Sequence, residues 1–347
     1  MDGLGTARLG TLVSALALCL ATGAARAEVK AGPVLMHWGL CEASAAAAYP
    51  AGSFGDRFLV VSDEDNTLRL YRSNESGPPL PLKGGDLGEA LGAGPGEGAG
   101  KADLEALAWL GSDLVLMGSH ARDAEGRTRE ASRQVLGLSV GGTAAEPAVT
   151  PKGKVFPGLA KAIAELDPRL AERIAVDLAE KPNLSPRRRG FSIEGLTPAP
   201  DGKGLLIGLR NPLSADNDAL VVPFENPAEV LASGAKPKLA KPIALDLKGR
   251  GIRDIAYAPG SKTYVIIAGG SGSGGESFDL YRWSGTPGAA PTRIAGAAEA
   301  LAAIPDFQPE GLLVSPDGTK VRLISDDADI CPARKPLSFR SVVLDLQ

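Results

Sequence analysis

The chain of 347 residues has few of the side chains on which several functional classes depend. It contains two histidines, three cysteines and only 5% aromatic residues, and its net charge is −4. With only His37 and His120 and no Cys/His cluster, a zinc site is not expected. The acidic balance and the shortage of aromatics exclude nucleic-acid binding. No serine lies in a nucleophile-elbow pattern, and the glycine-rich stretch 269–275 lacks the Lys-Ser/Thr ending of a phosphate-binding loop.

Also missing is an apolar run of the roughly 20 residues that a membrane span needs, so we expect no membrane span. Residues 1–27 instead read as a signal peptide: Arg8 precedes an apolar stretch at 9–20, and Ala25-Arg26-Ala27 has the pattern of a cleavage site. We therefore expect a single domain at 28–347, in a protein that is periplasmic or secreted.

Glycine (44) and proline (27) are abundant, as expected for many short strands joined by turns. A unit recurs five times, and each copy begins with an acidic residue in a small apolar segment. These starts are Glu42, Glu105, Glu194, Asp254 and Glu310. A second strand is predicted after each turn, at 58–61, 114–117, 205–209, 264–268 and 321–324. A third follows at 68–71, 135–140, 219–224, 279–283 and 341–346.

The repeats predict an all-β fold: a single β-propeller of about five blades, with six as the alternative count. A two-domain all-β arrangement is the main competitor. The longest interval, between Glu105 and Glu194, contains apolar residues at helical spacing from Leu159 to Ile174. This pattern predicts a small helical insertion at about 155–185 that packs on the rim.

Two cysteines, Cys41 and Cys331, lie in the predicted mature chain. If the ring closes, the first repeat lies beside the fifth, and the two thiols can form a closure disulfide in an oxidising compartment. Two buried free thiols are the alternative.

In a propeller, the start of each first strand and the end of each second strand lie on the same face near the axis. The five acidic starts are therefore expected together, either as ligand-binding groups or as a scaffold that bonds the backbone of neighbouring blades. Arg210 and His120, each after a second strand, are further candidates for ligand binding and for catalysis. His120 could act as a general acid or base, or as a hydrogen-bonding lid over a ligand.

Like charges at close range disfavour joint ionisation, so the ring is expected to meet arginines or a hard cation. Oxygen ligands from several carboxylates suit Ca²⁺. The loops after the second strands supply the candidate metal ligands Asp63, Glu64, Asp326 and Asp327. For the run at 63–66, a solvated turn is the alternative, because the EF-hand glycine and distal glutamate are absent.

Several segments carry a family resemblance that spans about residues 33–346. These are CEASAA, FLVVSDEDNTLRLYR, DLEALAWL, GSHAR, IEGLTPAPDG, GLRNPL, RGIRDIAYAPG and PEGLLV. They resemble a bacterial family of exported propeller proteins of unknown function. The repeated E-(A/G)-L element is also similar to phytase-like and esterase-like propellers, and that similarity implies Ca²⁺ and acidic clusters that handle phosphate esters.

Two functions follow as hypotheses. The first is an exported propeller with an acidic site for a ligand or Ca²⁺ on one face near the axis. The second is a Ca²⁺-dependent phosphoesterase in which Arg210 stabilises negative charge. The expected partner is a small molecule, phosphorylated or carbohydrate in nature, and the expected assembly is a monomer.

Overall fold

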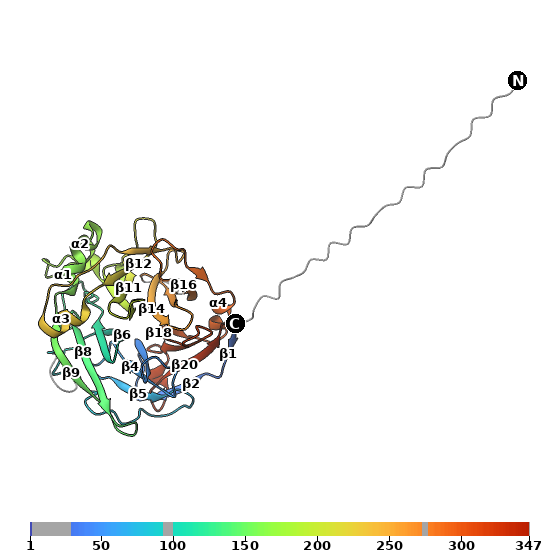
Figure 1. Cartoon of the computed structure of the whole chain (residues 1–347), viewed down its shortest axis with the longest axis horizontal. Coiled ribbons are helices and arrows are strands. Elements are labelled where there is room, and N and C mark those ends of the chain that lie inside the picture. Colours follow the sequence, from blue (N-terminus) through green and yellow to red (C-terminus); the bar gives the residue numbers. More distant parts are fainter. Residues whose placement is uncertain (2–28, 93–99, 273–276, 347) are drawn as a thin grey trace.

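Five antiparallel sheets surround a central axis in the computed structural model, which describes Met1 and residues 29–92, 100–272 and 277–346 (Figure 1). The predicted signal peptide at 1–27 lies outside these residues apart from Met1. Each innermost strand contacts the innermost strand of the next sheet, and the fifth contacts the first, so the ring is closed. The prediction of an all-β propeller is confirmed, with five blades.

The first blade has three strands and the next three blades have four. Blade 1 consists of β3 (Ala45–Tyr49), β4 (Arg57–Val61) and β5 (Arg69–Arg72). Blade 2 consists of β6 (Leu104–Leu110), β7 (Asp113–Gly118), β8 (Val135–Gly142) and β9 (Pro147–Phe156). Blade 3 consists of β10 (Ser192–Pro198), β11 (Leu205–Asn211), β12 (Ala219–Phe224) and β13 (Ile243–Leu245). Blade 4 consists of β14 (Gly251–Ala258), β15 (Thr263–Gly269), β16 (Asp279–Trp283) and β17 (Thr292–Arg293).

The fifth blade is built from both ends of the domain. Its inner strands are β18 (Gln308–Val314), β19 (Lys320–Asp326) and β20 (Ser338–Asp345). The outer positions beside β20 are taken by β1 (Lys30–Ala31) and β2 (Leu35–Trp38), which come from the beginning of the domain. The disulfide Cys41–Cys331 links the same two repeats, with its Cα atoms 5.5 Å apart. The predicted closure disulfide is therefore confirmed.

Apolar side chains fill the spaces between neighbouring blades, because each sheet can bury its faces only against the next. The predicted helical insertion is present as α1 (Leu159–Ala164) and α2 (Pro168–Ile174), with two short 3₁₀ turns after it, η1 (Pro182–Leu184) and η2 (Pro186–Arg188). Leu159, Ile163, Leu170 and Ile174 are buried in the core between blades 2 and 3, as the helical spacing predicts. The remaining short helices are α3 (Pro227–Ser233), α4 (Ala297–Ala302) and η3 (Cys331–Ala333).

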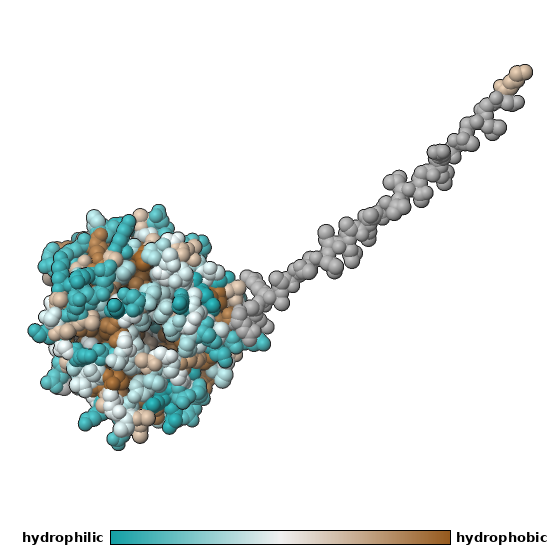
Figure 2. Space-filling view, in the orientation of Figure 1, coloured by the Kyte–Doolittle hydropathy of each residue, from teal (hydrophilic) through white to brown (hydrophobic). Residues whose placement is uncertain are grey.

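The ring has two faces. The five innermost strands begin on one of them, which we call the acidic face. The hairpin loops that follow these strands form the other, which we call the hairpin face. The face in Figure 2 is mixed, with hydrophobic patches among hydrophilic areas. Within the described residues, no helix is long and apolar enough to cross a membrane.

Candidate functional site

Four innermost strands carry a β-bulge near their first residues, and a charged side chain lies at each one. The register shifts place Glu105, Glu194, Arg253 and Glu310 at the bulges of β6, β10, β14 and β18. Ser44 holds the corresponding place before β3 and donates a hydrogen bond to the carboxylate of Asp63. A bulge re-aims a side chain. The acidic face therefore presents three carboxylates and one guanidinium at matching positions around the axis.

Arg253 was not among the site residues predicted from the sequence. It forms ion pairs with residues of the two blades on either side of its own. Its Nε lies 2.9 Å from Oε2 of Glu194, and its Nη2 forms an ion pair with Oε1 of Glu310. Arg253 and Glu194 are each 4% exposed. Arg210 lies on the other side of Glu194, with Nη1 3.0 Å from Oε1. The half of the ring formed by blades 3 and 4 is thus neutralised by arginine.

Asp254 differs from the other predicted acidic starts because it lies one residue further along its strand. The repeat aligned Asp254 with the glutamates, whereas the observed pairing aligns Arg253 with them. The Asp254 carboxylate accepts hydrogen bonds of 2.7 Å from the backbone N–H groups of Ile255 and Leu312. Leu312 belongs to blade 5, so Asp254 has the blade-to-blade scaffold role that was the alternative interpretation.

The half of the ring formed by blades 5, 1 and 2 is rich in carboxylates. Oxygens of Glu42, Asp63 and Glu64 lie within 4.8 Å of one another, and so do oxygens of Asp63, Asp103 and Glu105. Asp63 belongs to both groups. We call these five residues the carboxylate cluster. Among the described residues, two of its members form ion pairs with cations: Glu64 pairs with Lys101, and Asp103 lies 2.7 Å from Arg129.

Within the described residues, no ion pair joins Glu42, Asp63 or Glu105 to a lysine or arginine. Burial, together with the nearby charges of Glu64 and Asp326, raises the pKa of Glu42 to about 7. Burial, with the charges of Asp103 and Glu42, raises the pKa of Asp63 to about 8. Burial also raises the pKa of Glu105 well above its usual range. Lys101 near Glu42 and Arg253 near Glu105 oppose these increases only in part, so the pKa of each carboxyl stays raised.

We expect the free energy of unfolding of the metal-free protein to fall as the pH rises from about 6.5 to 8. Asp63 binds its proton more tightly in the folded state, so its contribution is complete at low pH and is lost as the pH approaches about 8. Glu42 acts in the same direction. Burial lowers the pKa of His37 and His120 to about 3, so their opposing contribution ends near the unfolded value of about 6.5.

Urea unfolding in EDTA at several pH values measures this slope. The variant Asp63→Asn should flatten it. A wild-type slope that stays flat or rises between these pH values would contradict the electrostatics of the cluster.

The loop after β19 contributes one carboxylate to this region. Asp326 forms a β-bridge with Glu42, and its charge helps to raise the pKa of Glu42. Asp327 is buried and points elsewhere, because it forms ion pairs with Arg334 at 2.8 Å and Arg340 at 2.7 Å. Of the four predicted metal ligands, the structure therefore brings Asp63, Glu64 and Asp326 near Glu42, and it holds Asp327 in a structural ion pair.

His120 is 1% exposed and has a backbone φ of 54°. Burial, with the charge of Arg133 nearby, lowers its pKa to about 3. A buried imidazole with this pKa is neutral at pH 7 and is a poor proton donor. We therefore leave His120 out of the proposed site.

A large cavity opens beside the ring, over blades 4 and 5. It has a volume of about 870 Å³, and its wall includes Arg187, Arg210, Phe278, Phe307, Gln308 and Asp329. Arg210 connects the cavity to the ring through Glu194. Asp329 connects it to the carboxylate cluster, because its charge contributes to the raised pKa of Glu42. The wall of the cavity thus combines arginine, aromatic and amide side chains, and the cavity lies near the carboxylate cluster.

Comparisons with known proteins leave the activity open. Residues 148–317 match the family described as a protein of unknown function, DUF3616. No curated protein matches the chain. A solved structure of hydrazine synthase of Kuenenia stuttgartiensis matches at 12% identity and a TM-score of 0.35; the match covers 84% of this chain and 60% of that one. A candidate 6-phosphogluconolactonase from Bacteroides uniformis is similar at 12% identity and a TM-score of 0.32, with 80% and 62% covered. The chain spans about 60% of the length of these solved structures.

Proposed function

We propose that the protein is an exported propeller that binds a divalent cation, Ca²⁺, at the carboxylate cluster and a small anionic or polyhydroxylated ligand in the adjoining cavity. The observation that carries this proposal is the asymmetry of the ring. Arginine neutralises the carboxylates in one half, whereas in the other half Glu42, Asp63 and Glu105 lie close together without an ion-pair partner among the described residues.

A hard cation is the natural counter-charge for such a cluster. Ca²⁺ takes six to eight oxygen ligands in flexible geometry, and carboxylates that bind in one- or two-oxygen modes supply them readily. Asp63 lies in both groups of close oxygens, so it is the ligand on which the site depends. Glu42, Glu64, Asp103 and Glu105 would complete the set with Asp63 and solvent. Bound Ca²⁺ would favour the ionised form of these groups and remove the repulsion among them.

The cavity supplies the second half of the proposed function. Arg187 and Arg210 provide planar donors that suit carboxylate or phosphate oxygens, and Gln308 and Asp329 can bond hydroxyl groups. Phe278 and Phe307 offer apolar surface against which a sugar ring or a similar group can pack. A phosphorylated or carbohydrate ligand fits this combination.

Thermal melting of EDTA-treated protein with increasing Ca²⁺ tests the metal site. We expect the midpoint to rise with Ca²⁺ until the site is saturated, because a ligand that binds only the folded state stabilises it. Asp63→Asn should abolish the shift. Asp56→Asn, a control at an exposed position in the hairpin between β3 and β4, should keep it. A wild-type midpoint that does not respond to Ca²⁺ would overturn the proposal.

The phosphoesterase hypothesis is distinguished by turnover. The two arginines on the cavity wall are the observation that favours it, since they could stabilise the negative charge of a phosphate ester beside bound metal. A panel of phosphate monoesters, assayed with Ca²⁺ and again with Arg210→Gln, decides between the two functions. Hydrolysis that requires both Ca²⁺ and Arg210 would establish an enzyme; a Ca²⁺-dependent melting shift without hydrolysis would establish a binding protein.

A further inference from the structure

We infer that the hairpin face contains a second, independent binding site, a pocket on the propeller axis for a small, neutral and largely apolar molecule with one hydrogen-bonding group. The pocket has a volume of about 290 Å³ and receives wall residues from all five blades. Its lining comes from the later residues of the innermost strands and from the hairpin loops that follow them. It is therefore distinct from the carboxylate cluster, which lies where those strands begin.

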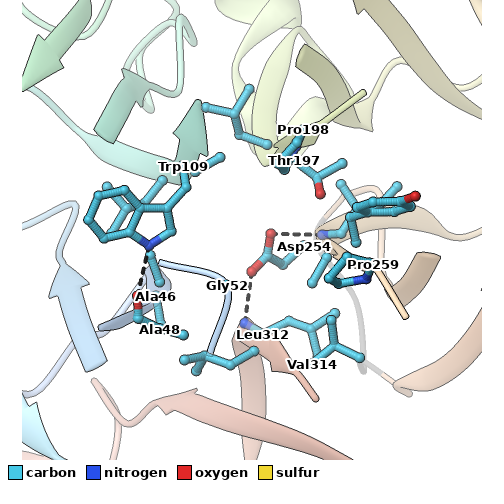
Figure 3. Close-up of a pocket in the computed structure, with 18 of the residues that line it drawn as sticks. Ala46, Ala48, Gly52, Trp109, Thr197, Pro198, Asp254, Pro259, Leu312 and Val314 are labelled. Carbon is cyan, nitrogen blue, oxygen red and sulfur yellow. Dashed lines mark hydrogen bonds between the residues drawn. The ribbon is translucent and has the colours of Figure 1, made fainter. Parts of the chain in front are cut away.

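The wall of this axial pocket is apolar because the repeats place small and hydrophobic residues there. Alanines of β3 at 46–48 leave space beside the ring of Trp109 from blade 2 (Figure 3). Tyr257 from blade 4 also lines the pocket. The Nε1 of Trp109 donates a hydrogen bond of 2.7 Å to the carbonyl oxygen of Ala48, so this ring is held in place. A pocket of about 300 Å³ with an apolar lining is of the size and kind that binds small molecules.

One polar group in the lining lacks a hydrogen-bond partner among the described residues. Thr197 is 1% exposed, and its hydroxyl oxygen accepts and donates no hydrogen bond there. Figure 3 shows this hydroxyl on the cavity side. Asp254, which also lines the pocket, already accepts two backbone N–H bonds. A buried hydroxyl without a partner is costly, and most such groups in folded proteins are bonded.

A bound ligand would account for the apolar pocket and for the unbonded hydroxyl of Thr197. It would fill an apolar space lined by two aromatic rings and exchange one hydrogen bond with Thr197. A charged molecule does not fit this pocket. Among the described residues that line it, Asp254 is the only charged one, and its carboxylate is already bonded to backbone N–H groups. The chemical class is thus a neutral aromatic or alicyclic compound with a single N–H or O–H group.

Titration calorimetry with indole and with 1-methylindole tests the inference, because the two probes share a bicyclic ring and differ in one N–H donor. We expect indole to bind the wild type about five- to tenfold more tightly than 1-methylindole does. Thr197→Val should remove this difference by weakening indole alone. It should also raise the melting temperature of the ligand-free protein, because it removes an unbonded buried hydroxyl.

Two further variants control the experiment. Thr292→Val, at an exposed position on β17, should bind both probes as the wild type does. Ala256→Leu, which adds three carbons to the pocket wall, should weaken both probes together. Circular dichroism checks that each variant folds, and if Ala256→Leu does not fold, Thr197→Val decides alone. Failure of indole to bind the wild type at millimolar concentration, or equal affinities of Thr197→Val and wild type for indole, would overturn the inference.

Discussion

Replacing Arg253 with methionine should lower the free energy of unfolding by about 3–5 kcal/mol, the largest effect we expect from a single substitution on the acidic face. The guanidinium is buried between Glu194 and Glu310, which belong to the two blades on either side of its own. Its removal takes away the cation that the two carboxylates share, and of these two only Glu194 keeps a further ion pair among the described residues, with Arg210. Urea unfolding followed by circular dichroism measures the loss.

The size of the effect comes from the charges left behind. Breaking a buried ion pair by removing one partner leaves an uncompensated charge away from water, whereas replacing both partners with neutral groups costs far less. The double variant Arg253→Met with Glu310→Gln should therefore recover part of the stability. Arg253→Lys should fall between wild type and Arg253→Met, because an ammonium group is a compact charge that cannot bond both carboxylates as a planar fork does.

The double variant provides an internal check on Arg253→Met. Arg253→Met with Glu310→Gln lacks one of the two charges, so it should be more stable than Arg253→Met even at acidic pH if charge causes the loss. A double variant that is no more stable than Arg253→Met would show that lost packing, and not lost charge compensation, causes the destabilisation.

Loss of the disulfide Cys41–Cys331 should cost about 4 kcal/mol. The two cysteines are 290 residues apart, and a bond that closes a long loop restricts the unfolded chain more than one that closes a short loop. The double variant Cys41→Ser with Cys331→Ser should unfold at lower urea concentration than wild type. Serine is chosen because Cys331 Sγ accepts a hydrogen bond from the backbone N–H of Ser338, which a hydroxyl can also accept.

Dithiothreitol gives the matched control for the disulfide. It should lower the unfolding midpoint of the wild type to about that of the double variant and leave the double variant unchanged. If β1 and β2 alone fix the ring, the double variant would unfold together with the wild type, and the disulfide would have no measurable part in closure.

Much of the fold could be predicted from the sequence because the same pattern of strands and turns recurs five times along the chain. The second strands at 58–61, 114–117, 205–209, 264–268 and 321–324 all lie within β4, β7, β11, β15 and β19. Alternation and turn residues are local signals, and each blade repeats them. The participation of β1 and β2 in the fifth blade left no such signal, because two short strands carry little pattern and their partner lies at the far end of the chain.

The candidate site could be predicted only in part, since side-chain position depends on register. The expectation that the acidic ring meets arginines agrees with the ion pair between Glu194 and Arg210 at 3.0 Å, and Asp63 and Glu64 do lie near Glu42. The sequence repeat placed Asp254 one residue away from its structural equivalents. The repeat was defined by an acidic start, and the residue at the equivalent position is Arg253, which has the opposite charge. Aligning I-R-D-I with I-E-G-L would have placed the arginine at the shared position.

Other features carry no sequence signal of their own. The burial of His120 depends on how the chain after β7 packs, and the ion pairs of Asp327 depend on Arg334 and Arg340 in the following segment. The axial pocket depends on the spacing of five strands at once. Each of these features depends on contacts between different segments of the chain, so no sequence pattern within one repeat could predict it.

The way in which the fifth blade is completed has a consequence for how the chain reaches its native state. Lys30 pairs with Asp345, so the first strand of the domain has no partner until nearly the whole chain exists. Bringing such distant segments together is slow, because the entropy of the intervening chain is lost before the contact can form. A chain that lacks β20 would leave β1 unpaired and β2 with only its bridge to Gly77, and such strand edges are prone to pair with other chains. The fifth blade can therefore be completed only after β20 has been synthesised.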